Sequence, residues 1–228
     1  MEYDASLISS HEVVPGVKSF RFARAPDFKY EAGQYVMAKL GAALFRFFSI
    51  SCSPTDEGYI EFTTRMSGSE YKSALDLLKS GDVIRIKGPF GNFTYKPEYR
   101  KIVFLSGGIG ITPIRSIMKY VSDGKIDTDI VLLYGNKNEE GIAFKKDLDE
   151  ISAGKRMKVV HVLSDPTATW TGYRGYITKD IIAKEVPDYL ERKFYIVGPP
   201  GMVAALTKTL GDMKIPKENI ILENFAGY

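Results

Sequence analysis

The chain is 228 residues long, 44% hydrophobic and 26% charged, with a formal net charge of +3. This composition is typical of a globular protein with a substantial core in one large or two small domains, and the small charge does not indicate a nucleic-acid partner. No apolar run approaches the ~18 residues of a membrane span, and the first residues lack the pattern of a signal peptide, so we expect a cytoplasmic protein.

Cysteine and histidine are too scarce to indicate a metal centre. Cys52 is the only cysteine, which excludes an internal disulfide and an iron–sulfur cluster held by four cysteines of this chain. His11 and His161 are the only histidines and are isolated in the sequence, so they do not indicate a zinc site. We therefore expect no bound metal.

Short strands separated by turn residues fill the sequence up to about Lys96. Apolar and polar residues alternate in segments such as YIEFTTR and DVIRIKG, as they do in half-buried strands. The expected strands are 17–23, 34–40, 46–51, 59–65 and 82–87. One helix is expected over 71–78, where Tyr71, Leu75 and Leu78 share a face. Regular short strands predict an antiparallel barrel.

The segment RFFSIS at 46–51 places an arginine, aromatic rings and a hydroxyl on one strand. Alternation sends Arg46 and Phe48 to one side of the strand, and Phe47 and Ser49 to the other. An arginine binds a diphosphate through charge-assisted hydrogen bonds, an aromatic ring packs on a planar ring, and a hydroxyl bonds the edge of that ring. A plain strand with aromatic core residues and an exposed arginine fits the same residues.

From Lys101 onward, strands and helices alternate. The expected strands are 102–105, 130–134, 159–163, 194–197 and 220–222, and the expected helices are 113–121, 142–151, 179–184 and 202–213. This alternation predicts a doubly wound parallel α/β sheet, in which ligands bind beyond the carboxyl ends of the strands. With a boundary near Pro97, the sequence predicts a β-barrel domain at 1–98 and an α/β domain at 99–228.

A glycine turn follows the first strand of the second domain. Gly107, Gly108 and Gly110 let the backbone turn sharply, Thr112 is placed to cap a helix, and Pro113 suits the first helical position. A strand, a glycine turn and a helix N-terminus present amide donors to a phosphate, so the segment predicts a dinucleotide site. Its spacing differs from G-x-G-x-x-G, and a turn made only for packing fits the same residues.

Four motifs occur in order across both halves: RFFSIS, GGIGITP, GPPGM and ENFAGY. Together with GQYV and KSGDVIRIKGPFGNF, they resemble the ferredoxin–NADP reductase superfamily over essentially the whole chain. The resemblance implies a flavin-binding N-terminal barrel, a C-terminal domain for a pyridine nucleotide, and a reductase without its own iron–sulfur domain. FAD is favoured over FMN because the likeness spans a full-size barrel.

The resemblance implies flavin contacts in the barrel. Arg46 would bind the flavin diphosphate, Phe48 would pack on the isoalloxazine, and Ser49 would face its reactive edge, with Phe47 in the same cofactor-binding motif. The family usually has tyrosine where this chain has Phe48, so stacking is retained while a phenol hydrogen bond is lost.

Two further barrel segments match the family less closely. The family's G-x-x-S element aligns with residues 69–72, where both signature residues differ. Lys72 would add positive charge near the diphosphate, although a helix start with a solvent-exposed lysine fits equally. Thr63 and Thr64 would lie near the flavin tail, although threonines are also ordinary strand residues.

The resemblance implies nucleotide contacts in two turns of the second domain. The implied residues are Gly107, Gly108, Gly110, Thr112 and Pro113 in the first turn, and Gly198, Pro199 and Pro200 in the second. Thr112 would lie near the nicotinamide–flavin junction. Val197 stands where the family often has a cysteine, so a thiol is missing there.

The end of the chain matches the family's glutamate-x-aromatic ending at residues 223–225. Phe225 would cover the flavin face opposite Phe48 and move aside for the nicotinamide. Tyr228 is an alternative stacking residue, or part of a tail packed on the barrel.

The choice of nucleotide depends on charged loop residues. Asp165 lies where NADP-using relatives often carry arginine, and a carboxylate there suits the ribose hydroxyls of NADH. Lys137 and Arg174 follow neighbouring strands, where a 2′-phosphate or solvent would suit their charge. We expect NADH, with NADPH left open.

These features predict a flavoprotein oxidoreductase that passes a hydride from NAD(P)H to bound FAD, with Ser49 and Phe225 at the reacting rings. Electrons would go on to a separate acceptor, such as ferredoxin, flavodoxin or a small molecule. A free-flavin or ferric reductase, and a non-catalytic flavin-binding subunit of a larger redox complex, are the alternatives.

Overall fold

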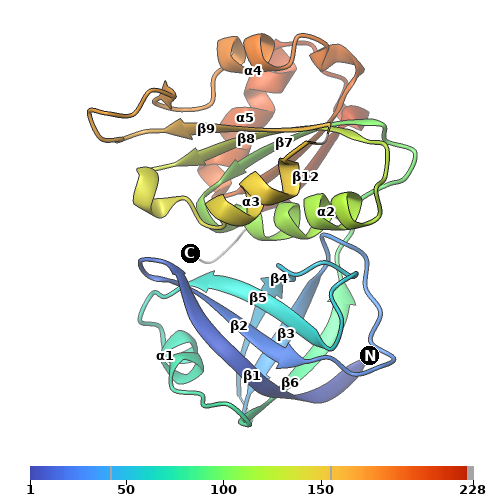
Figure 1. Ribbon diagram of the computed structural model, residues 1–228, viewed down its shortest axis with the longest axis vertical. Helices are drawn as coiled ribbons and strands as arrows, with labels where there is room; N and C mark the ends of the chain where they lie inside the picture. The colour runs from blue at the N-terminus through green and yellow to red at the C-terminus, as the bar shows by residue number, and fades with distance from the viewer. Residues whose placement is uncertain (42, 155, 225–228) are drawn as a thin grey trace. The chain divides into compact units, whose positions relative to one another are not determined.

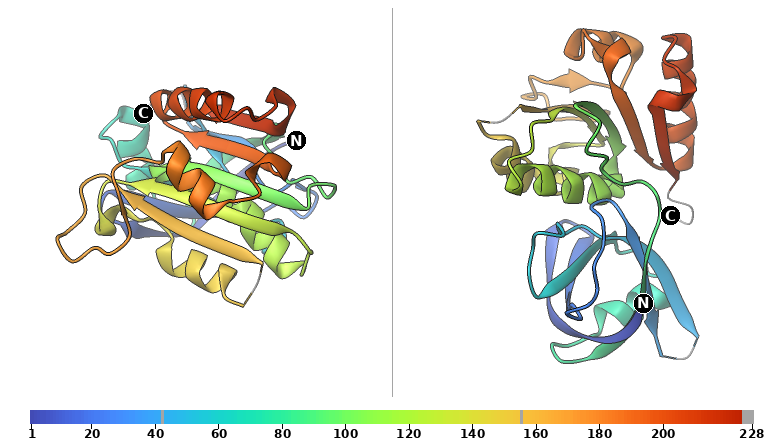
Figure 2. Two further views of the ribbon diagram at one scale, coloured as in Figure 1. Left: turned by 90° about the horizontal axis from the view of Figure 1, so that it is seen from above. Right: turned by 90° about the vertical axis from the view of Figure 1, so that its right-hand side faces the viewer.

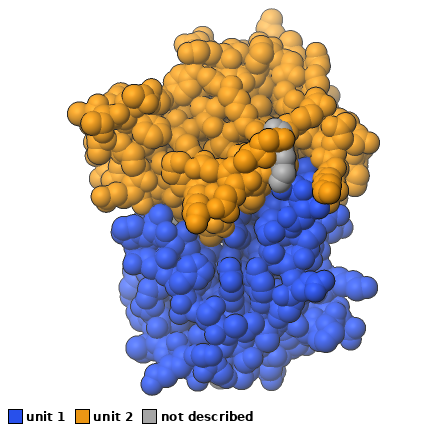
Figure 3. All heavy atoms as spheres, in the orientation of Figure 1, with its two compact units in different colours: residues 1–95, 112–123 blue, residues 96–111, 124–228 orange. Residues whose placement is uncertain are grey.

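The computed structural model describes residues 1–41, 43–154 and 156–224. Its contacts divide the chain into two compact units, one of residues 1–95 and 112–123, the other of residues 96–111 and 124 onward (Figure 3). Among the described residues, none of the helices is both long enough and apolar enough to cross a membrane.

The first unit is built on an antiparallel sheet that closes on itself. In its described part six strands follow the order β4-β3-β6-β1-β2-β5 (Figure 1). Their bounds are β1 Glu2–Val14, β2 Val17–Ala23, β3 Tyr35–Leu40, β4 Leu44–Ser49, β5 Tyr59–Arg65 and β6 Val83–Phe90, with helix α1 at Glu70–Asp76. Directly after β4, Ile50 forms an antiparallel bridge with Phe62 of β5. The two edge strands therefore meet, as in a barrel.

Aromatic side chains fill the inside of the barrel. Phe20, Phe22 and Phe62 are fully buried because alternate residues of β2 and β5 point inward. The Phe62 ring lies 5.9 Å from that of Phe20 and 5.4 Å from that of Phe22, both in stacked orientations. Such pairs add to the stabilisation from buried apolar area.

Helix α2 (Ile111–Asp123) belongs to the barrel unit from Thr112 onward, although its sequence lies within that of the second unit. It follows directly on the 3₁₀ turn η1 (Gly108–Gly110). Thr112 therefore lies inside the first helical turn, and its predicted capping position is wrong. Pro113 also lies in the first turn, where a missing N–H removes no helical hydrogen bond.

The second unit is a parallel sheet with the order β10-β9-β8-β7-β11-β12 in its described part (Figures 1 and 2). The strands are β7 Lys101–Gly107, β8 Asp129–Asn136, β9 Met157–Leu163, β10 Tyr173–Arg174, β11 Lys193–Gly198 and β12 Ile220–Asn224. The helices are α3 Lys145–Ser152, α4 Lys179–Glu185 and α5 Pro200–Asp212, with 3₁₀ turns η2 Glu139–Gly141, η3 Tyr189–Glu191 and η4 Lys217–Asn219.

Helices cover both faces of this sheet, with α4 and α5 on one side and α3 on the other (Figure 1). Ile182 of α4 and Leu206 of α5 belong to one buried cluster with Val103, Leu133 and Ile196 of the central strands. The residues that alternate with these, such as Ile102, Phe104 and Leu132, are also fully buried. The central strands are therefore apolar on both faces, as is usual in a parallel sheet covered on both sides.

Both expected architectures are confirmed, an antiparallel barrel followed by a doubly wound parallel sheet. Strand β1 was not expected, since only Ala5 and Leu7 of its residues are buried and its second half gives no apolar alternation. Helix α3 begins at Lys145 rather than at 142, because Phe144 has a left-handed backbone with φ of 60°.

Candidate cofactor-binding sites

Arg46 lies exposed on β4, above a buried aromatic ring. Its guanidinium carbon is 5.7 Å from the centroid of Tyr71, and its Nη1 donates to the carbonyl oxygen of Phe45 at 2.8 Å. Tyr71 is fully buried, and its hydroxyl donates to the carbonyl oxygen of Ala38 at 3.0 Å. The tyrosine gives Arg46 a fixed platform, and a guanidinium has five N–H donors with which to bind an anion.

The positive charges of Arg46 and Arg65 both act on a third cation, Lys72. Lys72 is 6% exposed, and its Nζ donates to the carbonyl oxygen of Arg65 at 2.7 Å. Burial lowers the pKa of Lys72, and the positive charges of Arg46 and Arg65 lower it further. A bound anion would stabilise Lys72 against the charges of the two arginines, so this group fits a phosphate or diphosphate. We call Arg46, Arg65 and Lys72 the cation cluster.

Arg65 was not among the residues expected from the sequence. It ends the strand YIEFTTR, where a basic residue looks like an ordinary exposed strand end. The only available signal was its position shortly before the turn that leads to Lys72. Ser69 caps α1 by accepting a hydrogen bond from the Lys72 backbone N–H at 3.4 Å, and this holds Lys72 in the first turn of the helix.

The two aromatic residues of the RFFSIS motif have opposite surroundings. Phe48 is 5% exposed and stacks on Phe62, with ring centroids 4.4 Å apart and planes 5° apart. Phe47 is 56% exposed and makes edge contacts with Tyr35 and Phe45. One face of Phe48 is therefore covered by the barrel core, and its expected contact with a flavin ring stays a prediction.

Ser49, Thr63 and Thr64 are all buried. The Thr63 hydroxyl lies 2.6 Å from that of Ser19 and 3.0 Å from that of Ser51, and Thr64 donates to the carbonyl oxygen of Arg65 at 3.4 Å. Thr63 thus belongs to a chain of buried hydroxyls on the face of β5 opposite to Phe62. Flavin contacts of these residues stay predictions.

The three glycines of the first turn differ in their surroundings. A Cβ at Gly110 would lie 2.6 Å from the carbonyl oxygen of Val197, and one at Gly107 would lie 2.4 Å from Sδ of Met202. Gly108 has φ of +52° with open space around it. Packing accounts for Gly107 and Gly110, whereas Gly108 leaves backbone accessible to a ligand.

The second turn leads into α5. A Cβ at Gly198 would lie 2.7 Å from Cε of Met202, and Pro200 starts the helix after an extended Pro199. Proline suits this first position because its nitrogen has no N–H to satisfy. Gly198 ends strand β11 beside Gly107, with a Cβ at Gly198 only 3.4 Å from the Gly107 nitrogen, so the two turns lie close together.

A row of side chains crosses the sheet at the carboxyl ends of three strands. Val197 of β11 pairs with Ser106 of β7 on one side and with Glu223 of β12 on the other. Residues paired in a parallel sheet point to the same face. Among the described residues, the Ser106 Oγ and the Glu223 Oε2 are buried and have no hydrogen-bond partner. Burial raises the pKa of Glu223 to about 7.

This row fits the carboxamide of a nicotinamide. A hydroxyl donates to a carbonyl oxygen, and a carboxyl group accepts from an amide NH₂, which are the two functions of a carboxamide. Sequence reasoning assigned no role to Ser106 and matched Glu223 only as part of an ending. Ser106 and Glu223 are identified only in the structure, because their side chains lie on the same face of the parallel sheet and each has a buried polar atom without a hydrogen-bond partner.

The three charged residues considered for nucleotide choice have different partners in the loops at the edge of the second unit. Asp165 and Lys137 form an exposed ion pair, with Nζ and Oδ2 3.9 Å apart. The Nη2 of Arg174 donates to the carbonyl oxygens of Thr167, Ala168 and Trp170 at 2.9, 3.2 and 3.0 Å. Arg174 therefore holds its own loop together.

The remaining expected residues are not placed in an open site. Thr112 and Pro113 are buried in α2. Phe225 and Tyr228 lie outside the described residues. In the part of the chain that is described, no three of the histidine, cysteine, aspartate and glutamate side chains form a group that could hold a metal ion.

Two family models match the chain. An oxidoreductase FAD-binding domain matches residues 4–95, and an oxidoreductase NAD-binding domain matches residues 104–208. The chain is 33% identical over 196 residues to NADH-cytochrome b5 reductase 1 of Dictyostelium discoideum, covering 82% of this chain and 68% of that protein. It is 32% identical over 218 residues to one component of the Na(+)-translocating NADH-quinone reductase of Haemophilus influenzae, covering 87% of this chain and 52% of that protein.

The chain spans about half the length of the first curated relatives it matches. Among solved structures, it is similar to the cytochrome b5 reductase domain of Ulva prolifera nitrate reductase, with a TM-score of 0.87 and 24% identity. The likeness covers 98% of this chain and 97% of that domain, and it supports the two-unit fold described above.

Proposed function

Because the chain belongs to the ferredoxin–NADP reductase superfamily of flavoprotein oxidoreductases, we propose that it oxidises NADH with a bound FAD and delivers the electrons to a separate acceptor. The observation that carries this proposal is the cation cluster within the part of the chain that matches an FAD-binding domain. A phosphate-bearing flavin would neutralise the positive charges of this cluster, whereas a flavin without phosphate would not.

The cation cluster would retain FAD rather than exchange it as a substrate. Arg46 offers directed N–H donors, and Lys72 is fixed by its bond to the Arg65 carbonyl. Charge-assisted hydrogen bonds of this kind contribute about 1.5–3 kcal/mol each. This favours a reductase with a resident flavin over a free-flavin reductase.

When bound, the flavin accepts a hydride at its N5 atom and can release electrons one at a time. The protein's part is to bind and orient the donor. Ser106 and Glu223 would hold the nicotinamide carboxamide, and the open backbone at Gly108 would approach the nucleotide phosphates. With its pKa at about 7, Glu223 is partly protonated at neutral pH and can donate or accept a hydrogen bond there.

NADH is the proposed donor because of the charged residues at the edge of the parallel sheet. The Asp165 carboxylate accepts from ribose hydroxyls and repels a 2′-phosphate. Its ion pair with Lys137 and the internal bonds of Arg174 leave both nearby cations engaged. The relatives named above as NADH-dependent enzymes agree with this preference.

The acceptor is proposed as a separate one-electron carrier. The names of the relatives refer to cytochrome b5 and to quinone, rather than to ferredoxin or flavodoxin. A haem protein of the cytochrome b5 class is therefore a more suitable first candidate than the ferredoxin or flavodoxin that the motifs suggested.

The test is an anaerobic titration of the purified protein, followed by its flavin absorbance. We expect a retained yellow flavin that bleaches fully with one equivalent of NADH and more slowly with NADPH. A protein that retains flavin but is reduced by neither nucleotide would be a non-catalytic binding protein. Loss of all flavin on desalting would favour the free-flavin reductase.

A further inference from the structure

We propose that Arg115 and Ser116 of helix α2 are positioning residues that fix the strand end carrying Ser49. This inference rests on the proposed flavin function, because Ser49 is the hydroxyl expected at the flavin edge. The sequence motifs give neither Arg115 nor Ser116 a role. The residues involved all lie within the barrel unit.

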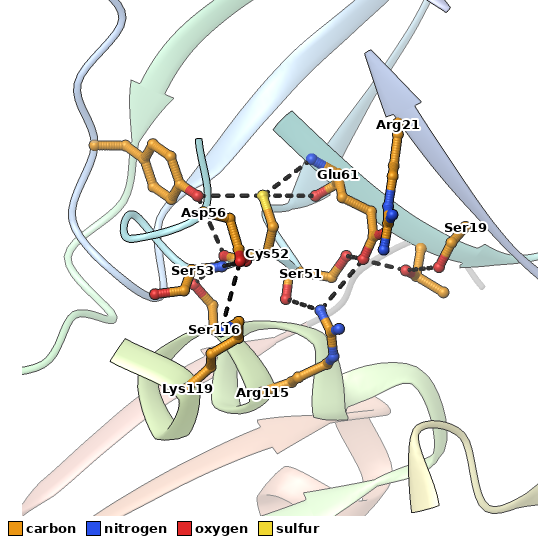
Figure 4. Close-up of polar contacts among 12 residues, drawn as sticks. Ser19, Arg21, Ser51, Cys52, Ser53, Asp56, Glu61, Arg115, Ser116 and Lys119 are labelled. Atoms are coloured by element: carbon orange, nitrogen blue, oxygen red, sulfur yellow. Dashed lines mark hydrogen bonds and ion pairs between the residues drawn. The ribbon is translucent and has the colours of Figure 1, made fainter. Parts of the chain in front are cut away.

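The segment after Ser49 leaves the regular ladder of β4. Ile50 and Ser51 are still held through their N–H groups, which donate to the carbonyl oxygens of Gln34 at 2.9 Å and Glu61 at 2.8 Å. The carbonyls of Ser51 and of the residue after it turn to helix α2 (Figure 4). Arg115 Nη1 donates to the Ser51 carbonyl oxygen at 2.7 Å.

Ser116 completes this arrangement. Its Oγ donates to the Cys52 carbonyl oxygen at 2.6 Å. Two consecutive helical residues thus bond two consecutive carbonyls of the segment that follows Ser49 (Figure 4). Without these donors the Ser51 carbonyl would lose its bond to Arg115, and the Cys52 carbonyl would keep only the longer bond from the Tyr30 hydroxyl at 3.3 Å, which is costly in a dry interior. The contacts therefore fix the backbone position of the segment.

A buried ion pair sets the position of Arg115 itself. Arg115 is 8% exposed, and its Nη1 lies 3.3 Å from Oε1 of Glu61, which is 1% exposed. Glu61 also accepts from Arg21 Nε at 2.7 Å and from the Ser51 hydroxyl at 3.0 Å. Breaking one partner of a buried pair leaves an uncompensated charge. The guanidinium is therefore held in one place, with Ser51 contacted at its carbonyl by Arg115 and at its hydroxyl by Glu61.

Helix α2 also offers a matched control. Lys119 lies one turn further along the same helix and pairs with the Asp56 side chain at 3.5 Å and with Asp123 at 2.8 Å. These bonds hold the helix at its exposed end and do not involve the carbonyls after Ser49. Lys119→Met removes charge from α2 while Arg115 and Ser116, the two donors to the carbonyls, stay in place; its partners Asp56 and Asp123 contact Ser53 and Thr55 further along the chain.

The experiment compares Arg115→Met, Arg115→Lys, Ser116→Ala and Lys119→Met in the full chain. For each, FAD affinity of the apoprotein is measured by fluorescence quenching, and the limiting rate of flavin reduction is measured at saturating NADH. We expect Arg115→Met and Ser116→Ala to weaken FAD binding by roughly tenfold, the equivalent of 1.4 kcal/mol. Arg115→Lys should restore part of the loss, and Lys119→Met should match the wild type.

Each variant is then repeated in a Ser49→Ala background. If Arg115 and Ser116 act through Ser49, their tenfold effect on FAD affinity, and any effect on the limiting reduction rate, should be smaller when the Ser49 hydroxyl is already missing. Equal effects in both backgrounds, or Lys119→Met matching Arg115→Met, would overturn the proposal. Should Arg115→Met fail to fold, Ser116→Ala carries the same test. A wild-type protein that binds no FAD would instead overturn the proposed function.

Discussion

Lys137 and Asp165 face each other across 3.9 Å at the carboxyl ends of neighbouring strands β8 and β9. In the proposed function, this pair would lie beside the ribose of the nucleotide. The Asp165 carboxylate neutralises the positive charge of Lys137 there. Replacing Asp165 by Ser removes the repulsion of a 2′-phosphate and releases Lys137. We expect the ratio of kcat/KM for NADPH to that for NADH to rise roughly tenfold, which corresponds to about 1.4 kcal/mol.

Steady-state kinetics with both nucleotides measures this change. Lys137→Ala added to Asp165→Ser should cancel most of the gain, because the released cation is then gone. An unchanged ratio in Asp165→Ser would remove this edge of the sheet from nucleotide selection.

The cation cluster predicts a graded loss of flavin. Arg46→Ala should weaken FAD binding by about 1.5–3 kcal/mol, the range for hydrogen bonds to charged groups. Arg65→Ala should cost less, because the Lys72 ammonium contacts the Arg65 backbone carbonyl rather than its side chain. Isothermal titration of apoprotein with FAD, FMN and riboflavin separates the phosphate contribution.

Riboflavin is the internal control for that measurement, since it has no phosphate. Its affinity should be the same in wild type and Arg46→Ala. An equal loss for riboflavin and FAD would place Arg46 away from the phosphates.

Glu223 predicts a pH dependence of stability with a defined sign. Its pKa rises from 4.5 to about 7 on folding, so the folded state holds more protons than the unfolded state between these values. Stability from this group therefore falls as pH rises through that window and is level above it. Glu223→Gln should abolish this slope, making the variant relatively more stable at pH 8 than at pH 4.

Urea unfolding of the wild type and of Glu223→Gln at pH 4, 6 and 8 measures the difference in their free energies of unfolding. Parallel stability curves for wild type and Glu223→Gln would show that the carboxyl group is solvated in solution. A binding titration with NAD⁺ at the same pH values tests whether the proton also affects the nucleotide.

Two glycines of the first turn are expected to have different roles, Gly110 in packing and Gly108 in contact with the nucleotide. Gly110→Ala should destabilise the fold by roughly 1–3 kcal/mol, because its Cβ would meet the Val197 carbonyl oxygen at 2.6 Å. Gly108→Ala has open space and should cost only about 1 kcal/mol for its positive φ, while weakening NADH binding. Thermal unfolding and NADH titration distinguish the two. Normal NADH affinity in Gly108→Ala would leave packing as the reason for the whole turn.

An ion-pair network at the other end of the sheet predicts stability at low pH. The hydrogen bond from Arg192 holds the pKa of Asp188 at about 2, and Lys101 contributes to this shift. A lowered pKa stabilises the fold above the unfolded value of 3.8 and loses this contribution as pH falls through about 2. Asp188→Asn should therefore lower Tm at pH 7, and the gap to wild type should narrow below pH 4. Asp127→Asn, whose partner Arg156 is largely exposed, should change Tm little.

The architecture was predictable because periodicity records which faces are buried. Strands with clear alternation, such as β2 and β5, were predicted with their observed bounds. Strand β1 was missed because its partners, rather than its own apolar residues, keep it extended. Helix α2 looked like part of the nucleotide domain, since a chain position does not reveal which unit a helix contacts.

The candidate sites were predictable where a motif has a recognisable composition, as around Arg46 and the glycines. Arg65, Ser106, Glu223 and Arg115 carry signals that exist only in three dimensions: convergence of charge, or polar atoms without partners. The burial of Phe48 against Phe62 likewise depends on a residue of another strand.

The placement of α2 in the barrel unit has a consequence for biosynthesis. Residues 1–95 emerge from the ribosome before the helix, when the carbonyls of Ser51 and Cys52 still have no donors from α2 and Glu61 has only one of its two arginines. The barrel then waits for residues 112–123, with the first strand of the other unit already made in between. The barrel unit can therefore reach its full set of contacts only after residues 112–123 have been translated.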